Sequence, residues 1–118
     1  MQYVLLFGLD PAAHSSNLPE DEQAAVTGQV MAWWEKHMQA GTLVGGARLQ
    51  LPETATTIRN VNDKPVVTDG PFIEAKEVLG GFGLIEADNF DEALALAKTW
   101  PLLEYPGQLV EIRPVWEM

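Results

Sequence analysis

The alternation of apolar and polar positions predicts strands at both ends and in the middle of the 118-residue chain. Residues 2–9 and 78–87 are apolar on both alternating faces, which is typical of central strands covered on both sides. Residues 42–51 and 108–115 are the expected outer strands. Between them, residues 54–68 hold two runs rich in β-branched residues, which predict a β-hairpin.

Two further segments carry apolar residues at helical spacing. The first begins near Pro19, has acidic residues in its first turn and ends at Gly41. The second begins at Asn89, which forms a predicted capping box with Glu92, and Pro101 stops it.

The predicted order is strand, helix, strand, hairpin, strand, helix, strand. This order fits one α+β domain over residues 1–118, with the split βαβ arrangement of a ferredoxin-like fold and an inserted β-hairpin. Two helices cover only one face of such a sheet, and the other face still carries large apolar side chains. We therefore predict a homodimer packed sheet to sheet.

Composition excludes several classes of function. The formal net charge of −10 argues against nucleic acid as a partner, because phosphate binding needs a positive surface. The chain has no cysteine, which excludes disulfides and thiolate chemistry, and its two histidines are too few for a predicted metal site. No cofactor is predicted. The short apolar run at the N-terminus predicts no membrane span, so a cytoplasmic protein is the expectation.

Polar residues gather in the segment from Asp69 onward. One interpretation of Asp69 is a general base or substrate anchor at a strand end; the other is a turn residue, since Asp, Gly and Pro together favour turns. Glu74 and Lys76 share a face if the segment is extended, and they then pair in solvent or hold a polar ligand together. Asp69 and Lys76 are the candidate catalytic residues, and Glu74 is a candidate ligand-binding residue.

Arg59 and Arg113 are two of only three arginines in this acidic chain. Arg113 lies in an otherwise apolar strand and needs a carboxylate partner, for which Asp69 and Glu111 are the candidates. Structural pairing and the binding of a small anion are both open for these arginines, so both are candidate ligand-binding residues. Gly80, Gly81 and Gly83 either open a pocket between the sheet and a neighbouring chain or allow a close approach of a helix.

The segment Val66-Val67-Thr68-Asp69-Gly70-Pro71-Phe72-x-Glu74-x-Lys76-Glu77-x-x-Gly80-Gly81-Phe82 closely resembles the signature of DGPF-domain proteins in the YCII-related family. The opening strand, Gly45-Gly46 and Glu111-x-Arg113-Pro114 agree with it, so the resemblance covers the whole chain. It implies a dimeric α+β barrel of ferredoxin-like units, a family without a settled activity, and in some relatives a link to extracytoplasmic-function sigma factors.

The chain departs from the resemblance at one point. Members of the family carry a His near the middle of the first helix and an Asp after the second helix, proposed as a catalytic pair. Here His37 lies at the end of its helix, and Trp100-Pro101 stands where Asp-Pro is expected. The first hypothesis is therefore a metal-independent small-molecule enzyme or binder that uses the region around Asp69. The alternative is a non-catalytic regulatory or interaction protein, linked to a sigma factor.

Overall fold

The computed structural model describes residues 1–10, 19–70 and 78–117. A four-stranded sheet has the order β2-β5-β1-β6, and each neighbouring pair is antiparallel. The strands of this sheet are β1 (Gln2–Leu9), β2 (Leu43–Arg48), β5 (Val78–Glu86) and β6 (Gln108–Pro114). The order confirms the predicted split βαβ arrangement, with the two doubly apolar strands in the centre.

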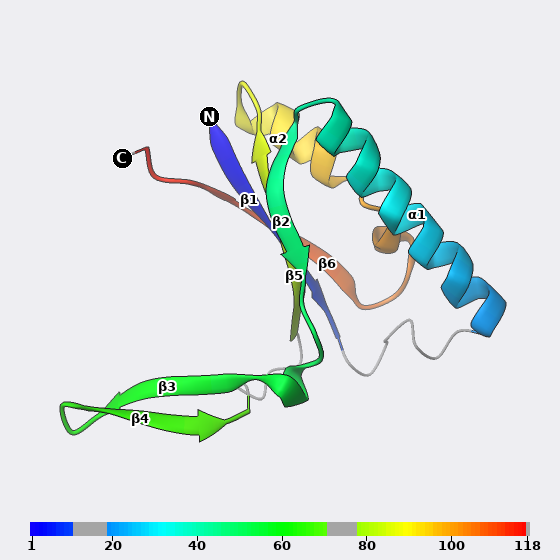
Figure 1. Cartoon of the computed structure of the whole chain (residues 1–118). Coiled ribbons are helices and arrows are strands. Elements are labelled where there is room, and N and C mark those ends of the chain that lie inside the picture. The colour runs from blue at the N-terminus through cyan, green and yellow to red at the C-terminus, as the bar shows by residue number, and fades with distance from the viewer. Residues whose placement is uncertain (11–18, 71–77, 118) are drawn as a thin grey trace.

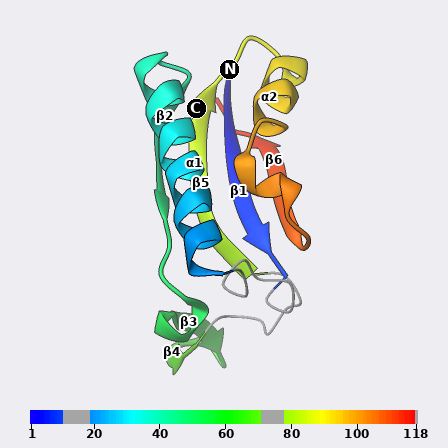
Figure 2. The same cartoon turned by 90° about the vertical axis from the view of Figure 1, so that its right-hand side faces the viewer.

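The helices α1 (Glu20–Gln39) and α2 (Phe90–Ala97) lie on the same face of the sheet (Figure 2). Helix α1 has the predicted acidic first turn, and Gly41 follows it with a positive φ of 77°. At α2 the Asn89 side chain accepts a hydrogen bond from the Glu92 N–H at 2.9 Å. The Glu92 carboxylate reaches back to the N–H of Asp88 rather than to that of Asn89.

The core lies between this face and the two helices, and aromatic rings dominate it. Phe7 stacks on Trp100 with a centroid distance of 4.0 Å and meets Trp33 edge-on at 6.0 Å. The Trp33 Nε1–H donates to the hydroxyl of Thr99 at 2.9 Å, which satisfies its polar atom. The buried core cluster consists of Tyr3, Leu5, Phe7, Trp33, Leu43, Ile85, Ala93, Ala97 and Trp100.

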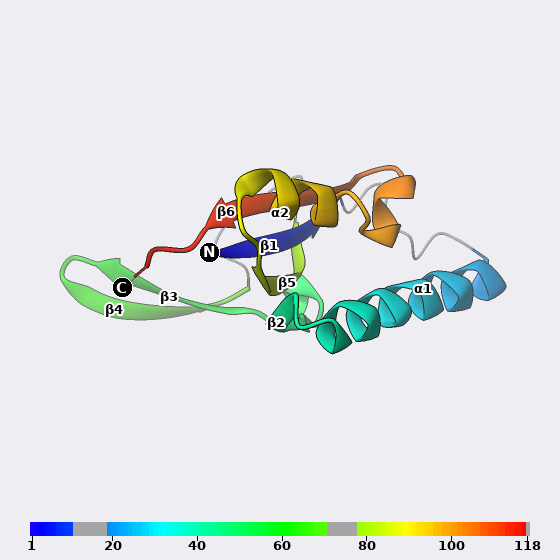
Figure 3. The same cartoon turned by 90° about the horizontal axis from the view of Figure 1, so that it is seen from above.

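The predicted hairpin forms a separate two-stranded sheet of β3 (Thr56–Val61) and β4 (Lys64–Asp69). Asn62 and Asp63 make its turn with φ of 53° and 66°, which is typical of a tight type I′ connection. The hairpin projects from the body on the side away from α1 (Figures 1 and 3). The radius of gyration is 16.1 Å, whereas a compact chain of this length has about 13.5 Å.

Short 3₁₀ helices occupy two stretches where the sequence predicted strand or loop. Helix η3 (Pro52–Thr54) follows β2, which ends earlier than predicted, and η4 (Pro101–Glu104) follows α2. The predicted extent of β2 to residue 51 is therefore wrong. Proline stands at the start of both 3₁₀ helices, where its fixed φ fits and no N–H is needed.

Candidate functional site

Asp69 and Gly70 lie at the base of the hairpin. Asp69 is the last residue of β4, stands opposite Thr56 and is exposed. Gly70 adopts φ +105°, its N–H donates to the carbonyl of Ala55 at 2.7 Å, and its own carbonyl accepts from the Thr57 hydroxyl at 2.7 Å. The glycine therefore has the positive φ that the turn interpretation requires. The Asp69 carboxylate remains on the surface.

Glu74 and Lys76 lie outside the described residues, as do Pro71 and Phe72. Their candidate roles stay predictions from the sequence.

Arg113 lies on β6 and pairs with Glu111 two residues before it. The Arg113 Nε lies 2.5 Å from a Glu111 carboxylate oxygen, and the Arg113 side chain is 69% exposed. Of the two carboxylates considered as partners, Glu111 is the one the structure shows. Because the pair is exposed, it contributes at most about 1 kcal/mol to stability.

Arg59 lies in the middle of β3, opposite Val66, and is exposed. Since side chains alternate along a strand, Arg59 and Asp69 lie on opposite faces of the hairpin. Arg113 lies on the main sheet, which is separate from the hairpin (Figure 1). Within one chain, the described candidate residues are therefore not brought together.

The sheet face away from the helices is apolar at its centre. It also carries the Glu111–Arg113 pair and, at one end of the strands, Gln2 and Glu86, which stand opposite each other. Cross-strand register places Leu84 and Arg113 beside Val4, and Phe82 and Glu111 beside Leu6. Phe82 is 37% exposed, and Val4, Leu6 and Leu84 are half-buried. We call this surface the open face and define it by Val4, Leu6, Ala47, Phe82, Leu84, Leu109, Glu111 and Arg113.

The glycines of β5 allow close packing against β2. A Cβ on Gly81 would lie 2.9 Å from the carbonyl oxygen of Ala47, and one on Gly83 would lie 3.2 Å from Leu43. Both distances are too short for an added methyl group without a shift of its neighbour. The nearest atoms belong to β2 and β1 rather than to a helix, so the close approach at Gly81 and Gly83 is between strands and not the predicted approach of a helix.

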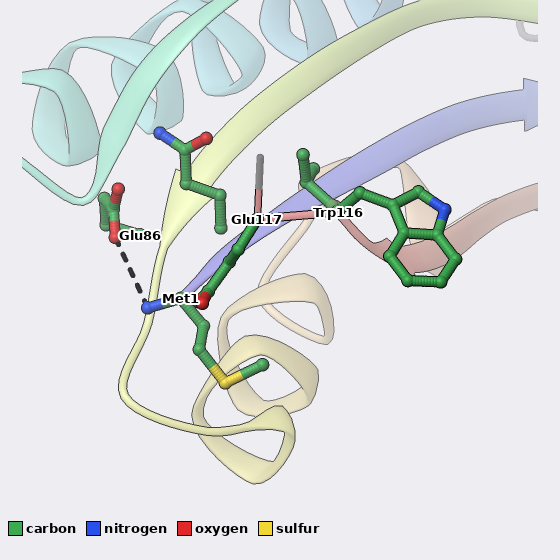
Figure 4. Close-up of a pocket in the computed structure, with 6 residues that line it drawn as sticks. Met1, Glu86, Trp116 and Glu117 are labelled. Atoms are coloured by element: carbon green, nitrogen blue, oxygen red, sulfur yellow. Dashed lines mark ion pairs between the residues drawn. The ribbon is translucent and has the colours of Figure 1, made fainter.

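A hollow that the sequence did not indicate lies where the two chain ends meet (Figure 4). It has a volume of about 500 Å³ and is lined by Met1, Gln2, Glu86, Val115, Trp116 and Glu117. The α-amino group lies 3.6 Å from the Glu86 carboxylate. Trp116 is 88% exposed. The hollow depends on the pairing of segments more than a hundred residues apart, for which no local pattern exists.

A second hollow follows β2. Its volume is about 470 Å³, and its lining includes Arg48, Leu51 and Glu53. By strand alternation Arg48, which stands opposite Gly81, lies on the helix side of the sheet rather than on the open face.

His37 lies in the last turn of α1, where its ring meets Trp33 edge-on at 4.7 Å. Burial lowers the pKa of His37 below its ordinary value, and the neighbouring Lys36 charge lowers it further. This confirms a helix-end histidine packed on the core. Trp100, where the resemblance places an Asp, is only 5% exposed and belongs to the core.

Within the described ranges, no group of three His, Asp or Glu side chains is placed to hold a metal ion. In the same part of the chain, no helix is long and apolar enough to cross a bilayer.

Comparison with known proteins gives three findings. The sequence matches the family model described as "YCII-related domain" over residues 1–118. It is 34% identical over 115 residues to Uncharacterized protein R00369 of Rhizobium meliloti (strain 1021), covering 98% of this chain and 92% of that protein. The fold resembles that of 5-chloro-2-hydroxyhydroquinone dehydrochlorinase (TftG) from Burkholderia phenoliruptrix AC1100, solved in complex with 2,5-dihydroxybenzoquinone. That likeness has a TM-score of 0.51 at 15% identity and covers 99% of this chain and 94% of TftG.

Proposed function

The chain belongs to the YCII-related domain family, and we propose that it acts as a homodimer that binds a small, oxygenated, acidic molecule between two facing sheets. In the proposed dimer the open faces of two copies meet, and the two sheets together form a dimeric α+β barrel. A cytoplasmic location is part of the same proposal.

The exposed surface supports association. The chain exposes 8392 Å², whereas a compact monomer of its mass exposes about 6,300 Å². The difference exceeds the roughly 800 Å² that each partner buries in a standard interface. The open face supplies the apolar side chains that such an interface needs.

The single observation that carries the ligand proposal is Arg113 on the open face. Arg113 stands beside the apolar side chain of Val4, so it combines apolar contact with one oriented charge, which is typical of small-molecule sites. Its partner Glu111 holds it in place from the same strand. The 2,5-dihydroxybenzoquinone bound by TftG is a ring of this chemical class, which supports a similar ligand on a similar fold.

Acid–base chemistry is the reaction type that the candidate residues could supply. In this proposal Asp69 accepts a proton from a ligand hydroxyl, and Lys76 donates a proton or stabilises the negative charge that forms on the ligand. Arg59 and Glu74 bind the ligand. Because Asp69 is exposed at the hairpin base, Asp69→Asn should leave the fold intact and lower turnover or binding. Lys76→Ala should do the same. If both variants unfold, the motif is structural.

The decisive test is calorimetric titration of the wild-type protein with 2,5-dihydroxybenzoquinone and with benzoate. Arg113→Gln should weaken binding at least about tenfold, since a hydrogen bond to a charged group contributes about 1.5–3 kcal/mol. Arg48→Gln is the matched control, because it removes the same charge from the other side of the sheet. Equal affinities of the two variants would contradict a role for Arg113.

A regulatory role, with a sigma factor or another basic protein as the partner, is the second candidate. The observation that favours it is the net charge of −10, which suits a basic partner. A wild-type dimer that binds neither probe but retains a sigma factor in a pull-down would favour this role over the first.

A further inference from the structure

The hairpin β3–β4, residues 56–69, is an arm that lacks extensive packing on the described body of its own chain. The two strands pack on each other, and no other described element packs extensively on either of them. An isolated two-stranded hairpin is marginally stable in water at best. The arm therefore needs a surface to cover one of its faces.

The two faces of the arm differ in exposure. One face is apolar at its centre, and its apolar side chains are more exposed than those of the other face. Ile58 and Val67 stand directly opposite each other and are 68% and 64% exposed. On the other face, Val61 and Val66 are 42% and 40% exposed. Directly opposed β-branched side chains form a continuous apolar surface across the two strands. The Ile58–Val67 face is thus the face that gains most from being covered.

The position of the arm indicates what covers it. The arm extends on the side of the sheet away from α1, beside the open face (Figures 1 and 3). A body that docks on the open face is therefore flanked by the arm. In a two-fold dimer the same contact occurs twice, once for each arm, which doubles the apolar area it contributes.

The charge of the arm fits the same partner. Residues 56–69 contain two basic side chains, Arg59 and Lys64, and two acidic ones, Asp63 and Asp69. The arm is neutral, and the net charge of −10 lies entirely on the rest of the chain. A neutral arm can lie on the acidic body of another copy without the like-charge repulsion that two bodies experience.

We propose that the Ile58–Val67 face of the arm packs on a second copy of the chain and clamps the dimer. This inference rests on the homodimer of the proposed function and adds a second contact to it. The arm contact and the sheet contact can fail separately.

The test compares two neighbouring valines on opposite faces of the arm. Val67→Lys places a charge on the proposed contact face, and Val66→Lys places the same charge on the other face. The dimer dissociation constant of each full-length variant is measured by analytical ultracentrifugation. Val67→Lys should raise it at least about tenfold, as loss of a central apolar contact does, and Val66→Lys should change it less than about twofold.

A labelling experiment covers the case in which a lysine variant does not fold. Because the chain has no cysteine, Val67→Cys carries a single thiol. Its rate of reaction with a maleimide should fall as the protein concentration rises through the dimer dissociation constant. The rate of Val66→Cys should stay constant.

The outcomes separate this inference from the proposed function. A wild-type dimer with equal effects of the two valine substitutions and a concentration-independent Val67→Cys rate overturns the arm contact and leaves the dimer standing. A wild-type chain that stays monomeric at high micromolar concentration overturns both. A Val66→Lys effect larger than that of Val67→Lys overturns the assigned face.

Discussion

Among the glycines that the structure describes, Gly46 is the one whose substitution by Ala should destabilise the protein most. Gly46 lies in β2 with φ +139°, a conformation that side-chain-bearing residues rarely adopt. A Cβ at this position would lie 2.3 Å from the carbonyl oxygen of Phe82, 2.8 Å from Trp34 and 2.9 Å from the Cα of Gly83. Two of these three atoms belong to the backbone of β5, so the methyl group cannot be accommodated by a side-chain rotation.

The magnitude follows from two costs. A Cβ on a residue at positive φ lowers the free energy of unfolding by about 1–2 kcal/mol. Overpacking against fixed neighbours lowers it by about 1–3 kcal/mol more. Together they predict a loss of about 3 kcal/mol in the free energy of unfolding. For a domain of this size, that loss lowers the melting temperature by about 12 °C.

Thermal unfolding followed by circular dichroism measures the effect. All variants are compared at one protein concentration, because the proposed dimer would make the melting temperature depend on concentration. Gly28→Ala is the matched control. Gly28 lies in α1 with nothing within 4 Å of the added Cβ, so Ala should stabilise the helix by about 0.5–1 kcal/mol. A Gly46→Ala protein that melts within about 2 °C of the wild type would refute the assigned packing between β2 and β5.

Two further predictions concern the helices. Asn89→Ala removes the side chain that caps α2 and should lower the free energy of unfolding by about 1 kcal/mol, measured by urea denaturation, whereas Asn89→Asp should change it little. His37 should titrate below its ordinary value in NMR, because burial and then Lys36 lower its pKa. The unfolded chain then binds more protons than the folded one, so stability should fall as the pH drops through 6.5 toward the folded-state pKa. His37→Gln should lose this part of the pH dependence, and an unchanged profile would contradict the packing of His37 on Trp33.

The parts of the fold that the sequence predicted are those encoded by local patterns. The sequence of residues 2–9 and 78–87 predicts central strands, because both faces of each segment are apolar. The structure places the two strands side by side in the middle of the sheet. The cap at Asn89 is equally local, since donor and acceptor are three residues apart. The turn at Asn62 and Asp63 is encoded by the tolerance of these residue types for positive φ.

What the sequence could not give depends on distant segments. The hairpin was predicted from its two β-branched runs. Its projection as an arm follows from the lack of extensive packing between it and the rest of the described chain, which no local pattern encodes. Trp116 is a large apolar residue that lies exposed, because the last strand ends before it. Arg113 had two candidate partners in the sequence. Only the strand geometry, which places residues two apart on the same face, selects Glu111.

The core position of Trp100 bears on where chemistry can take place. Trp100 stacks on Phe7 and is almost fully buried, so a carboxylate at this position would be desolvated next to aromatic rings. The helix side of the sheet is thus closed to the His/Asp pair that the resemblance implies, and the polar candidates that the structure describes lie on the arm and on the open face. In one chain Asp69 and Arg113 belong to separate sheets, and a second copy on the open face is the simplest way to enclose either residue. A ligand that binds only in the space between two copies stabilises the dimer by mass action, so in the proposed arrangement ligand affinity and dimer strength rise and fall together.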